Sequence, residues 1–114
     1  MTEQNDNTTG QAAQLLYNVT TQVTWAVHDA WLAWMLDEYI PAILGTGSFI
    51  KHQLVRLLEA DETDGPIYAV QYYVANSAVF DAYINLYRDG FAMLEEDKWG
   101  AAIFSFSSLM QVVN

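Results

Sequence analysis

The stretch 31–49 constrains the fold of this chain more than any other part of the sequence. Large apolar residues recur there at helical spacing, and the pattern predicts an amphipathic helix over 25–44 with Thr24 as its N-cap. Pro41 is expected to bend this helix or to restart its last turn, and Gly45 stands where a left-handed C-terminal cap belongs. The stretch therefore predicts a helix, a glycine stop and the entry to a strand at Phe49.

One face of the expected helix is apolar, which predicts that it packs against a core. With about 100° between successive residues, Glu38 falls near the middle of the apolar arc, whereas Asp37 and Ile40 lie opposite. The large members of the arc are Val27, Trp31, Leu32, Trp34, Met35 and Tyr39. Each such side chain contributes about 1.5–3 kcal/mol when fully buried, so this face is expected to hold the helix on a sheet.

Alternation of apolar and polar residues predicts strands in the remainder of the chain. The expected strands span residues 15–23, 49–60, 67–75 and 102–113. The polar segment 61–66 contains Asp-Gly-Pro, which favours a turn and joins the second and third strands as an antiparallel hairpin. Residues 1–13 lack periodic apolar content, so they are expected to form a disordered tail before a single domain at 14–114.

A second helix is expected to begin after Asn76 and Ser77, which supply an N-cap, and to continue through Glu95. Its expected core positions recur mostly at spacings of three and four: Val79, Phe80, Tyr83, Tyr87, Phe91 and Leu94. Arg88 falls on the side expected to face water. The last strand then places Phe104, Phe106 and Met110 on one face and Ser105 and Ser107 on the other.

The order strand, helix, strand, strand, helix, strand predicts an α+β, ferredoxin-like fold. Right-handed crossovers place the first and third strands in the centre of a four-stranded antiparallel sheet, with two helices on one face. The open face is expected to be half apolar and to carry Leu16, Asn18, Thr20, Ile67, Gln71, Tyr73, Ile103, Ser105, Ser107 and Leu109. Such a face favours a second copy of the chain, and two facing sheets would form a dimeric α+β barrel.

Charge and composition exclude several classes of function. Four basic residues stand against 14 acidic ones, and the net charge of −10 opposes binding to nucleic acid and to anionic membranes. The absence of cysteine excludes thiolate catalysis and disulfides. No apolar run reaches the length of about 18 residues that a transmembrane helix needs, and residues 1–7 contain neither the basic nor the apolar region that is typical of a secretion signal. A soluble cytoplasmic protein without a cofactor is expected.

Three residues are candidates for catalysis. Glu38, if it is buried beside aromatic residues, could act as a general acid or base; alternatively it reaches solvent or pairs with Arg56. His52 and Arg56 alternate on the second strand and could serve in acid–base or anchoring roles. His28 and His52 lack the close spacing of metal ligands, so no metal site is expected.

The high aromatic content allows two interpretations. Aromatic residues at helical spacing usually form a core, but here they could also line a pocket for a flat apolar ligand. The candidate ligand-binding residues are Asn18, Trp34, Tyr39 and Tyr73, with Trp25, His52 and Trp99 as possible neighbours.

The run from Trp31 through Trp34, Met35 and Pro41 to Phe49, preceded by Tyr-Asn-Val-Thr at 17–20, resembles a bacterial family of small proteins known as DUF4286. The resemblance extends through the strand 68–72 and covers nearly all of the expected domain. It implies a ferredoxin-like protomer in a dimeric α+β barrel, but no activity. Family members often carry histidine where this chain has Tyr39, which argues against a role based on an imidazole there.

These observations leave three functional hypotheses. The first is a homodimer that binds a small apolar or aromatic ligand. The second is a small enzyme of the cofactor-independent monooxygenase or isomerase kind, and the third is a structural or regulatory dimer without a pocket. A cavity of about 300 Å³ with convergent polar groups would separate the first two from the third.

Overall fold

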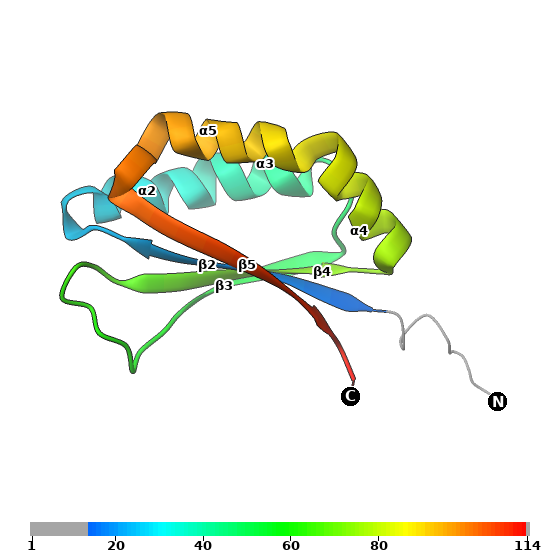
Figure 1. The fold of residues 1–114 in the computed structure, drawn as a ribbon, viewed down its shortest axis with the longest axis horizontal. Helices are drawn as coiled ribbons and strands as arrows, with labels where there is room; N and C mark the ends of the chain where they lie inside the picture. Colours follow the sequence, from blue (N-terminus) through cyan, green and yellow to red (C-terminus); the bar gives the residue numbers. More distant parts are fainter. Residues whose placement is uncertain (1–13, 114) are drawn as a thin grey trace.

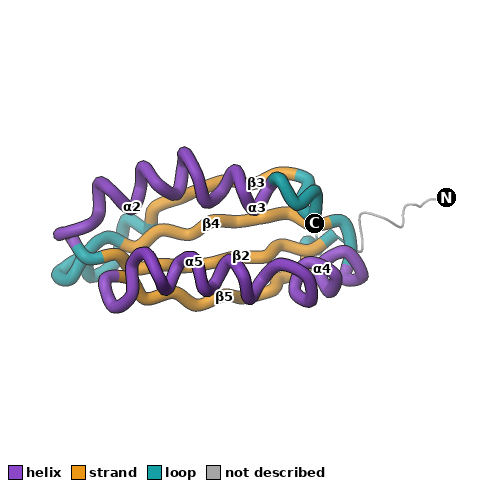
Figure 2. The backbone as a smooth tube through the Cα atoms, turned by 90° about the horizontal axis from the view of Figure 1, so that it is seen from above, coloured by secondary structure: helices purple, strands orange, loops and turns teal. Residues whose placement is uncertain are grey.

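The computed structural model describes residues 14–113, and its helices and strands follow the predicted order (Figure 1). The strands are β2 (Leu15–Val23), β3 (Lys51–Arg56), β4 (Ile67–Val74) and β5 (Ile103–Gln111). All neighbouring pairs are antiparallel, and the sheet order β3-β4-β2-β5 places β2 and β4 in the centre, as predicted. The helices cover one face of this sheet (Figures 1 and 2). The α+β, ferredoxin-like fold is thus confirmed, and the predicted tail at 1–13 lies outside the described residues.

The first helical segment is continuous but changes its hydrogen-bonding pattern midway. It consists of a 3₁₀ turn η1 (Trp25–Val27), α2 (His28–Trp34), a π turn η2 (Met35–Tyr39) and α3 (Ile40–Leu44). A π turn contains one residue more than an α turn, so it rotates every later residue by about 100° around the axis. Ile40 is therefore buried, with 2% of its surface exposed, and Glu38 is exposed. The prediction that Ile40 lies opposite the core was wrong for this reason.

Pro41 is the second residue of α3, one residue after the π turn ends at Tyr39, and in the first turn its missing N–H group interrupts the fewest hydrogen bonds. The segment thus restarts its last turn at Pro41, as the sequence predicted. The left-handed glycine that follows is Gly47, with φ of 77°, whereas Gly45 has an ordinary helical φ of −64°. The assignment of the left-handed cap to Gly45 was wrong, because the helix ends with hydrogen bonds that carry the turn two residues further.

The second helical segment contains the same irregularity. It consists of α4 (Ser77–Tyr83), a π turn η3 (Ile84–Arg88), α5 (Asp89–Trp99) and a 3₁₀ turn η4 (Gly100–Ala102). The predicted N-cap is confirmed, since Asn76 Oδ1 accepts a hydrogen bond of 3.0 Å from the Val79 backbone N–H. After the π turn the buried face changes: Leu94 is 53% exposed, while the neighbouring Glu95 lies against the sheet side of the helix.

The last strand has the opposite orientation from the one predicted. Ser105 pairs with Thr21 and Ser107 pairs with Val19, and Thr21 is buried beneath the helices. Because directly paired residues share a face, the serines of β5 also point toward the helices. The alternate set, Phe104, Phe106, Ser108 and Met110, joins Asn18, Thr20, Gln71 and Tyr73 on the open face. Ile103, Ser105, Ser107 and Leu109 were therefore wrongly placed on the open face.

Aromatic packing fills most of the space between helices and sheet. Trp31, Val23 and Val74 are completely buried. The Tyr17 ring packs on Phe80 with a centroid distance of 5.1 Å, and Phe49 packs on Tyr83 at 4.8 Å. This core fixes the two helices over the sheet, and the space that it leaves open lies between the second helical segment and β5.

Candidate functional site

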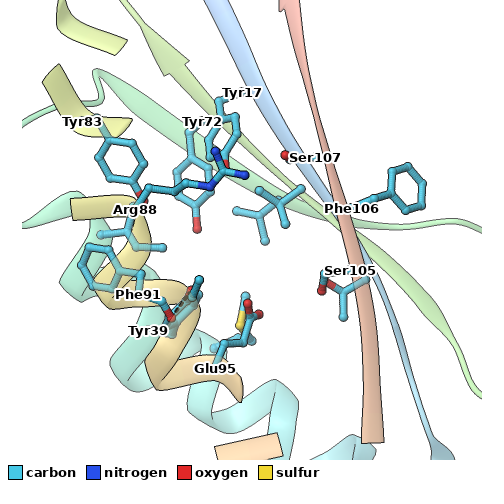
Figure 3. A pocket seen from close by; sticks show the side chains of 16 residues that line it. Tyr17, Tyr39, Tyr72, Tyr83, Arg88, Phe91, Glu95, Ser105, Phe106 and Ser107 are labelled. Carbon is cyan, nitrogen blue, oxygen red and sulfur yellow. Dashed lines mark hydrogen bonds between the residues drawn. The ribbon is translucent and has the colours of Figure 1, made fainter. Parts of the chain in front are cut away.

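A cavity of about 300 Å³ lies between the helices and the sheet, beside the edge strand β5 (Figure 3). Both helical segments and the strands β2, β4 and β5 contribute to its walls. Its lining residues are Tyr17, Val19, Thr21, Met35, Tyr39, Ile43, Val70, Tyr72, Tyr83, Arg88, Phe91, Ala92, Glu95, Ser105, Phe106 and Ser107. Phe106 belongs to the rim, because its ring points away from the cavity in Figure 3.

Tyrosines form much of the wall. Tyr39 donates a hydrogen bond of 3.1 Å from its hydroxyl to the Phe91 carbonyl. The hydroxyls of Tyr17, Tyr72 and Tyr83 have no hydrogen-bond partner among the described residues. Burial, aided by the negative charge of Glu95, raises the pKa of Tyr39 and of Tyr72 well above the ordinary tyrosine value. These phenols therefore stay neutral and can donate a proton in a hydrogen bond to a ligand oxygen.

Glu95 and Arg88 bring charge to the cavity from the second helical segment. Burial raises the pKa of Glu95, because the carboxylate loses hydration beside the aromatic rings. A hydrogen bond from the Tyr39 hydroxyl would lower the pKa of Glu95. The single proton of that hydroxyl is donated to the Phe91 carbonyl, so Glu95 receives this hydrogen bond only when the hydroxyl rotates away from Phe91. Arg88 and Glu95 do not form an ion pair with each other in the described part of the chain.

The β5 wall is polar. Thr21 and Ser105 share a hydrogen bond of 2.7 Å between their hydroxyls, and Ser107 follows on the same face of the strand. Figure 3 shows these serines across the cavity from Arg88, Phe91 and Glu95. The cavity thus combines an aromatic floor, a hydroxyl-bearing wall and one carboxylate.

Of the ligand-binding residues predicted from the sequence, Tyr39 lines this cavity. Trp34 lies behind it, buried, with its ring stacked on Tyr39 at a centroid distance of 4.5 Å. Asn18 and Tyr73 lie on the open face of the sheet, where Asn18 bonds Thr20 and the Lys51 ammonium lies over the Tyr73 ring. The predicted ligand set is therefore divided between two faces of the sheet.

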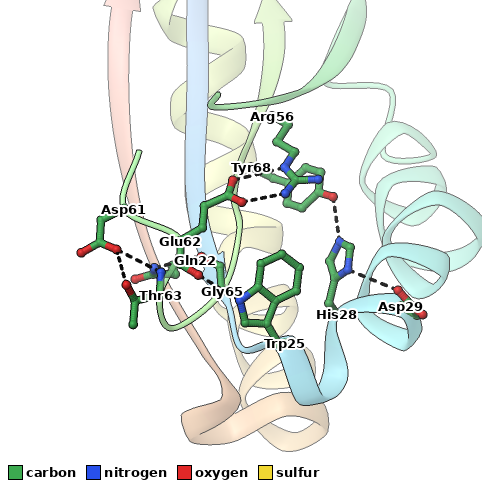
Figure 4. A network of polar contacts seen from close by, with 10 residues as sticks. All are labelled: Gln22, Trp25, His28, Asp29, Arg56, Asp61, Glu62, Thr63, Gly65 and Tyr68. Atoms are coloured by element: carbon green, nitrogen blue, oxygen red, sulfur yellow. Dashed lines mark hydrogen bonds and ion pairs between the residues drawn. The ribbon is translucent and has the colours of Figure 1, made fainter. Parts of the chain in front are cut away.

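The three predicted catalytic residues do not line the cavity. Glu38 and His52 are exposed, which agrees with the solvent alternative for Glu38. Arg56 forms a two-bond ion pair with Glu62 across the β3–β4 loop, with a shortest distance of 2.8 Å, instead of pairing with Glu38 (Figure 4). Any catalytic role for the three stays a prediction.

A polar network fixes the β3–β4 loop to the beginning of the first helical segment (Figure 4). The Trp25 indole N–H donates to the Glu62 carbonyl at 2.9 Å, and Gln22 donates to the Gly65 carbonyl at 3.1 Å. His28 Nε2 lies 2.7 Å from the Tyr68 hydroxyl, and its other ring nitrogen lies 3.2 Å from Asp29. Each group is satisfied locally, so this network is a structural connection.

No group of three or more acidic or histidine side chains among residues 14–113 is arranged to hold a metal ion. In the same part of the chain, no helix combines the length and apolar character required to span a membrane.

Sequence reasoning missed Arg88, Glu95 and the inward side of β5. A usable signal was present, because Phe91, Glu95 and Trp99 recur at spacings of four and both aromatic residues are only partly exposed. Had Phe91 and Trp99 been taken together as the buried stripe, Glu95 would have fallen between them.

Comparison with solved structures shows the same fold. SnoaB, a cofactor-independent oxygenase from Streptomyces nogalater, is similar with a TM-score of 0.65 and 14% identity over 90% of this chain and 96% of that protein. A monooxygenase from the gene ActVA-Orf6 of Streptomyces coelicolor, in complex with the ligand nanaomycin D, gives a TM-score of 0.61 with 10% identity over 90% of each chain. A dimeric ferredoxin-like protein from an uncultured marine organism gives 0.57 with 13% identity over 90% of this chain and 97% of that one.

Sequence comparison adds a family but no activity. None of the curated proteins is significantly similar to the chain. The family model described as "Domain of unknown function (DUF4286)" matches residues 14–113, which is the entire described part.

Proposed function

The chain belongs to the DUF4286 family, and we propose that it binds a small, flat aromatic ligand in the cavity of a homodimeric α+β barrel. One observation carries the proposal: a cavity of about 300 Å³ is lined by tyrosines, of which Tyr17, Tyr72 and Tyr83 have hydroxyls without a protein partner among the described residues. These hydroxyls are open to the space of the cavity, so they can bond a ligand that brings its own oxygen atoms between the aromatic walls.

The size and chemistry of the cavity define the ligand class. Small-molecule sites usually occupy about 300–1,000 Å³ and combine apolar walls with a few polar groups, so this cavity suits a ligand at the small end of that range. The rings of Tyr39 and Phe91 meet edge to face at 5.8 Å and offer aromatic surface. A bicyclic aromatic molecule with a carbonyl or phenolic oxygen matches this surface and the free hydroxyls.

Calorimetric titration with 2-naphthol and 2-tetralone tests the binding proposal. Ala92 lines the cavity, and the variant Ala92→Trp places an indole there, so binding should weaken at least about tenfold. Ala82→Trp is the matched control, because Ala82 is exposed on the same helical segment outside the cavity. Failure of the wild-type protein to bind either compound, or equal binding by both variants, would contradict the proposal.

The homodimer is proposed to form through the open face of the sheet. This face carries exposed apolar residues of β5, including Phe104, which is 69% exposed, together with Phe106 and Met110. Exposed apolar surface of this kind is typical of an interface, and the similar marine protein is described as dimeric. The net charge of −10 continues to argue against nucleic acid as a partner, and a cytoplasmic location belongs to the same proposal.

Sedimentation at micromolar concentration tests the dimer. Phe104→Glu places a charge on the open face and should shift the protein to monomer. Leu86→Glu is the control, because Leu86 is 73% exposed on the second helical segment, away from the sheet. A monomeric wild-type protein, or dimers of equal stability for both variants, would refute this arrangement.

An enzyme of the cofactor-independent oxygenase or isomerase kind is the second candidate function. It is supported by the fold shared with SnoaB and by the ionisable side chain of Glu95 in the cavity. A sequence identity of 14% supports a shared fold but not a shared activity. The chemistry must therefore be argued from the residues of this cavity.

A further inference from the structure

Glu95 occupies a position suited to proton transfer. Its side chain extends from α5 into the cavity, toward the centre of the space between helices and sheet (Figure 3). No cation pairs with it in the described part of the chain. A poorly hydrated carboxylate without an ion-pair partner accepts a proton more readily than an exposed one, and burial raises the pKa of Glu95 in agreement with this placement.

Hydrogen-bond donors lie across the cavity from this carboxylate. Tyr72 comes from the central strand β4, and Figure 3 shows its hydroxyl pointing into the cavity between Arg88 and Glu95. The hydroxyl has no protein partner among the described residues. A fixed, neutral donor placed opposite a base can stabilise negative charge that develops on a substrate oxygen.

From this arrangement we infer that the cavity catalyses the enolisation of small aromatic ketones, with Glu95 as the base and Tyr72 as the donor to the developing oxyanion. The inference rests on the proposed ligand-binding function, because the ketone must occupy the cavity. It narrows the isomerase hypothesis to one reaction and assigns two catalytic residues that the sequence did not suggest.

The reaction requires no oxidant, reductant or second substrate. The Glu95 carboxylate takes a proton from the carbon next to the ketone, and the C–H bond breaks. Its electron pair forms a carbon–carbon double bond, while the carbonyl π pair moves onto oxygen and gives an enolate that accepts a hydrogen bond from Tyr72. The protonated Glu95 then returns the proton to the same or to a conjugated carbon, which completes exchange or isomerisation.

The groups that face Glu95 come from every element packed around it. Tyr39 of η2, Tyr72 of β4 and Tyr83 of α4 are neutral phenols, β2 contributes Tyr17 and Thr21, and β5 contributes uncharged serines. Arg88 is the cationic residue among those that line the cavity. The rate of proton abstraction should therefore rise with pH as Glu95 loses its proton, and should then reach a plateau.

Deuterium uptake by 2-tetralone in D₂O, followed by NMR, tests the inference. The wild-type protein should accelerate exchange at the carbon between the ring and the carbonyl, and Glu95→Gln should reduce this rate about 10²–10⁴-fold. Glu96→Gln is the matched control, since Glu96 is the exposed neighbour outside the cavity and should leave the rate unchanged. Tyr72→Phe removes only the hydroxyl and should lower the rate about 10²–10³-fold.

Calorimetric binding of 2-tetralone to the same variants separates the two proposals. Tight binding by wild type and Glu95→Gln, with exchange lost in the variant, supports both. Binding by wild type without exchange above that of Glu95→Gln overturns the catalytic inference and leaves ligand binding intact. Absence of binding to the wild-type protein overturns the catalytic inference together with the binding proposal on which it rests.

Discussion

The two helical segments of this protein contain the same irregularity with different consequences. Each is interrupted by a five-residue π turn, η2 in the first and η3 in the second. In the first segment the rotation moves Glu38 into solvent and brings Ile40 into the core. In the second it leaves Leu94 in solvent and brings Glu95 to the cavity.

The difference teaches that an extra helical residue can serve packing or chemistry, depending on which residue it turns inward. Compared with a regular α-helix, the first segment buries the apolar Ile40 in place of the carboxylate of Glu38, which strengthens the core. The second segment turns the carboxylate of Glu95 inward in place of the apolar Leu94, and burial makes the charged form of this carboxylate less stable. A π turn is often found at functional sites, and η3 fits that tendency because it places Arg88 and Glu95 together on the cavity side.

The largest expected effect compares the two residues that the sequence pattern assigned to the wrong side. Ile40→Ala should destabilise the protein by about 2–5 kcal/mol, because Ile40 is buried after the first π turn. Leu94→Ala should change stability by less than about 0.5 kcal/mol, because Leu94 is largely exposed after the second. Urea unfolding measures both, and a larger loss for Leu94→Ala would disprove the rotation.

Deletion of one residue from each π turn distinguishes their causes. Leu36 and Leu86 are both exposed. Deletion of either one removes the extra residue of its π turn, so the segment can form a regular α-helix in which the residues before and after the turn keep facing the sheet as they do now. Deletion of Leu36 then places Pro41 inside an unbroken α-helix, which should cost about 3 kcal/mol more than deletion of Leu86. Thermal unfolding gives the comparison.

Equal losses for the two deletions would show that Pro41 does not require its π turn. The deletion of Leu86 should also preserve exchange of 2-tetralone, because Glu95 keeps its face. Loss of exchange in a folded variant would mean that the π turn itself positions the carboxylate.

The pH dependence of stability tests the burial of Glu95. Burial raises its pKa in the folded protein, so the folded state binds this proton more strongly than the unfolded state. The stability of the wild type relative to Glu95→Gln should therefore be greatest at low pH. It should fall as the pH rises from the ordinary glutamate range, about 4.3, through the raised pKa, and then remain constant.

Urea unfolding of wild type and Glu95→Gln at a series of pH values measures this difference directly. Because both proteins share all other titrating groups, subtraction isolates Glu95. Parallel curves for the two proteins would show that the pKa of Glu95 is the same in the folded and unfolded states. The second π turn would then not place a buried carboxylate in the cavity.

The smallest expected effect concerns the helix backbone beside the second π turn. Gly90 follows η3 at an exposed position, and a Cβ atom added there would meet nothing within 4 Å. Gly90→Ala should stabilise the protein by about 0.5–1 kcal/mol, and Ala33→Gly at an exposed position of the first segment should destabilise it by a similar amount. Thermal unfolding of the pair provides the measurement, and destabilisation by Gly90→Ala would reveal a requirement for glycine.

Local patterns predicted the elements and their order because each depends on neighbouring residues. The alternation at 15–23 predicted the bounds of β2, and Asn76 predicted the beginning of α4. The third strand was predicted to within one residue, because a turn precedes it and the polar N-cap of the next helix follows it. By contrast, β3 is shorter than the predicted 49–60, because its residue pairing with β4 runs from Lys51 to Arg56 and Leu57 adds one backbone hydrogen bond to Ile67 beyond it.

The candidate site was less accessible to sequence reasoning. Tyr39 was recognised because it belongs to the apolar arc and, as the last residue of the first π turn, it is still buried. Glu95 was assigned to no site, because a constant step of about 100° carries no information about an inserted residue. Its position depends on the residue that the π turn η3 inserts between α4 and α5.

The sequence by itself determined the order of strands and helices, the antiparallel hairpin and the ferredoxin-like topology, because hydrophobic periodicity and turn residues act locally. Only the tertiary structure decided which side of β5 faces the helices and which residues each helix buries after its π turn. The physical reason is that alternation divides a strand into two faces without saying which one is inside. The choice depends on neighbours distant in sequence, here Thr21 beside Ser105 and the cavity that Glu95 lines.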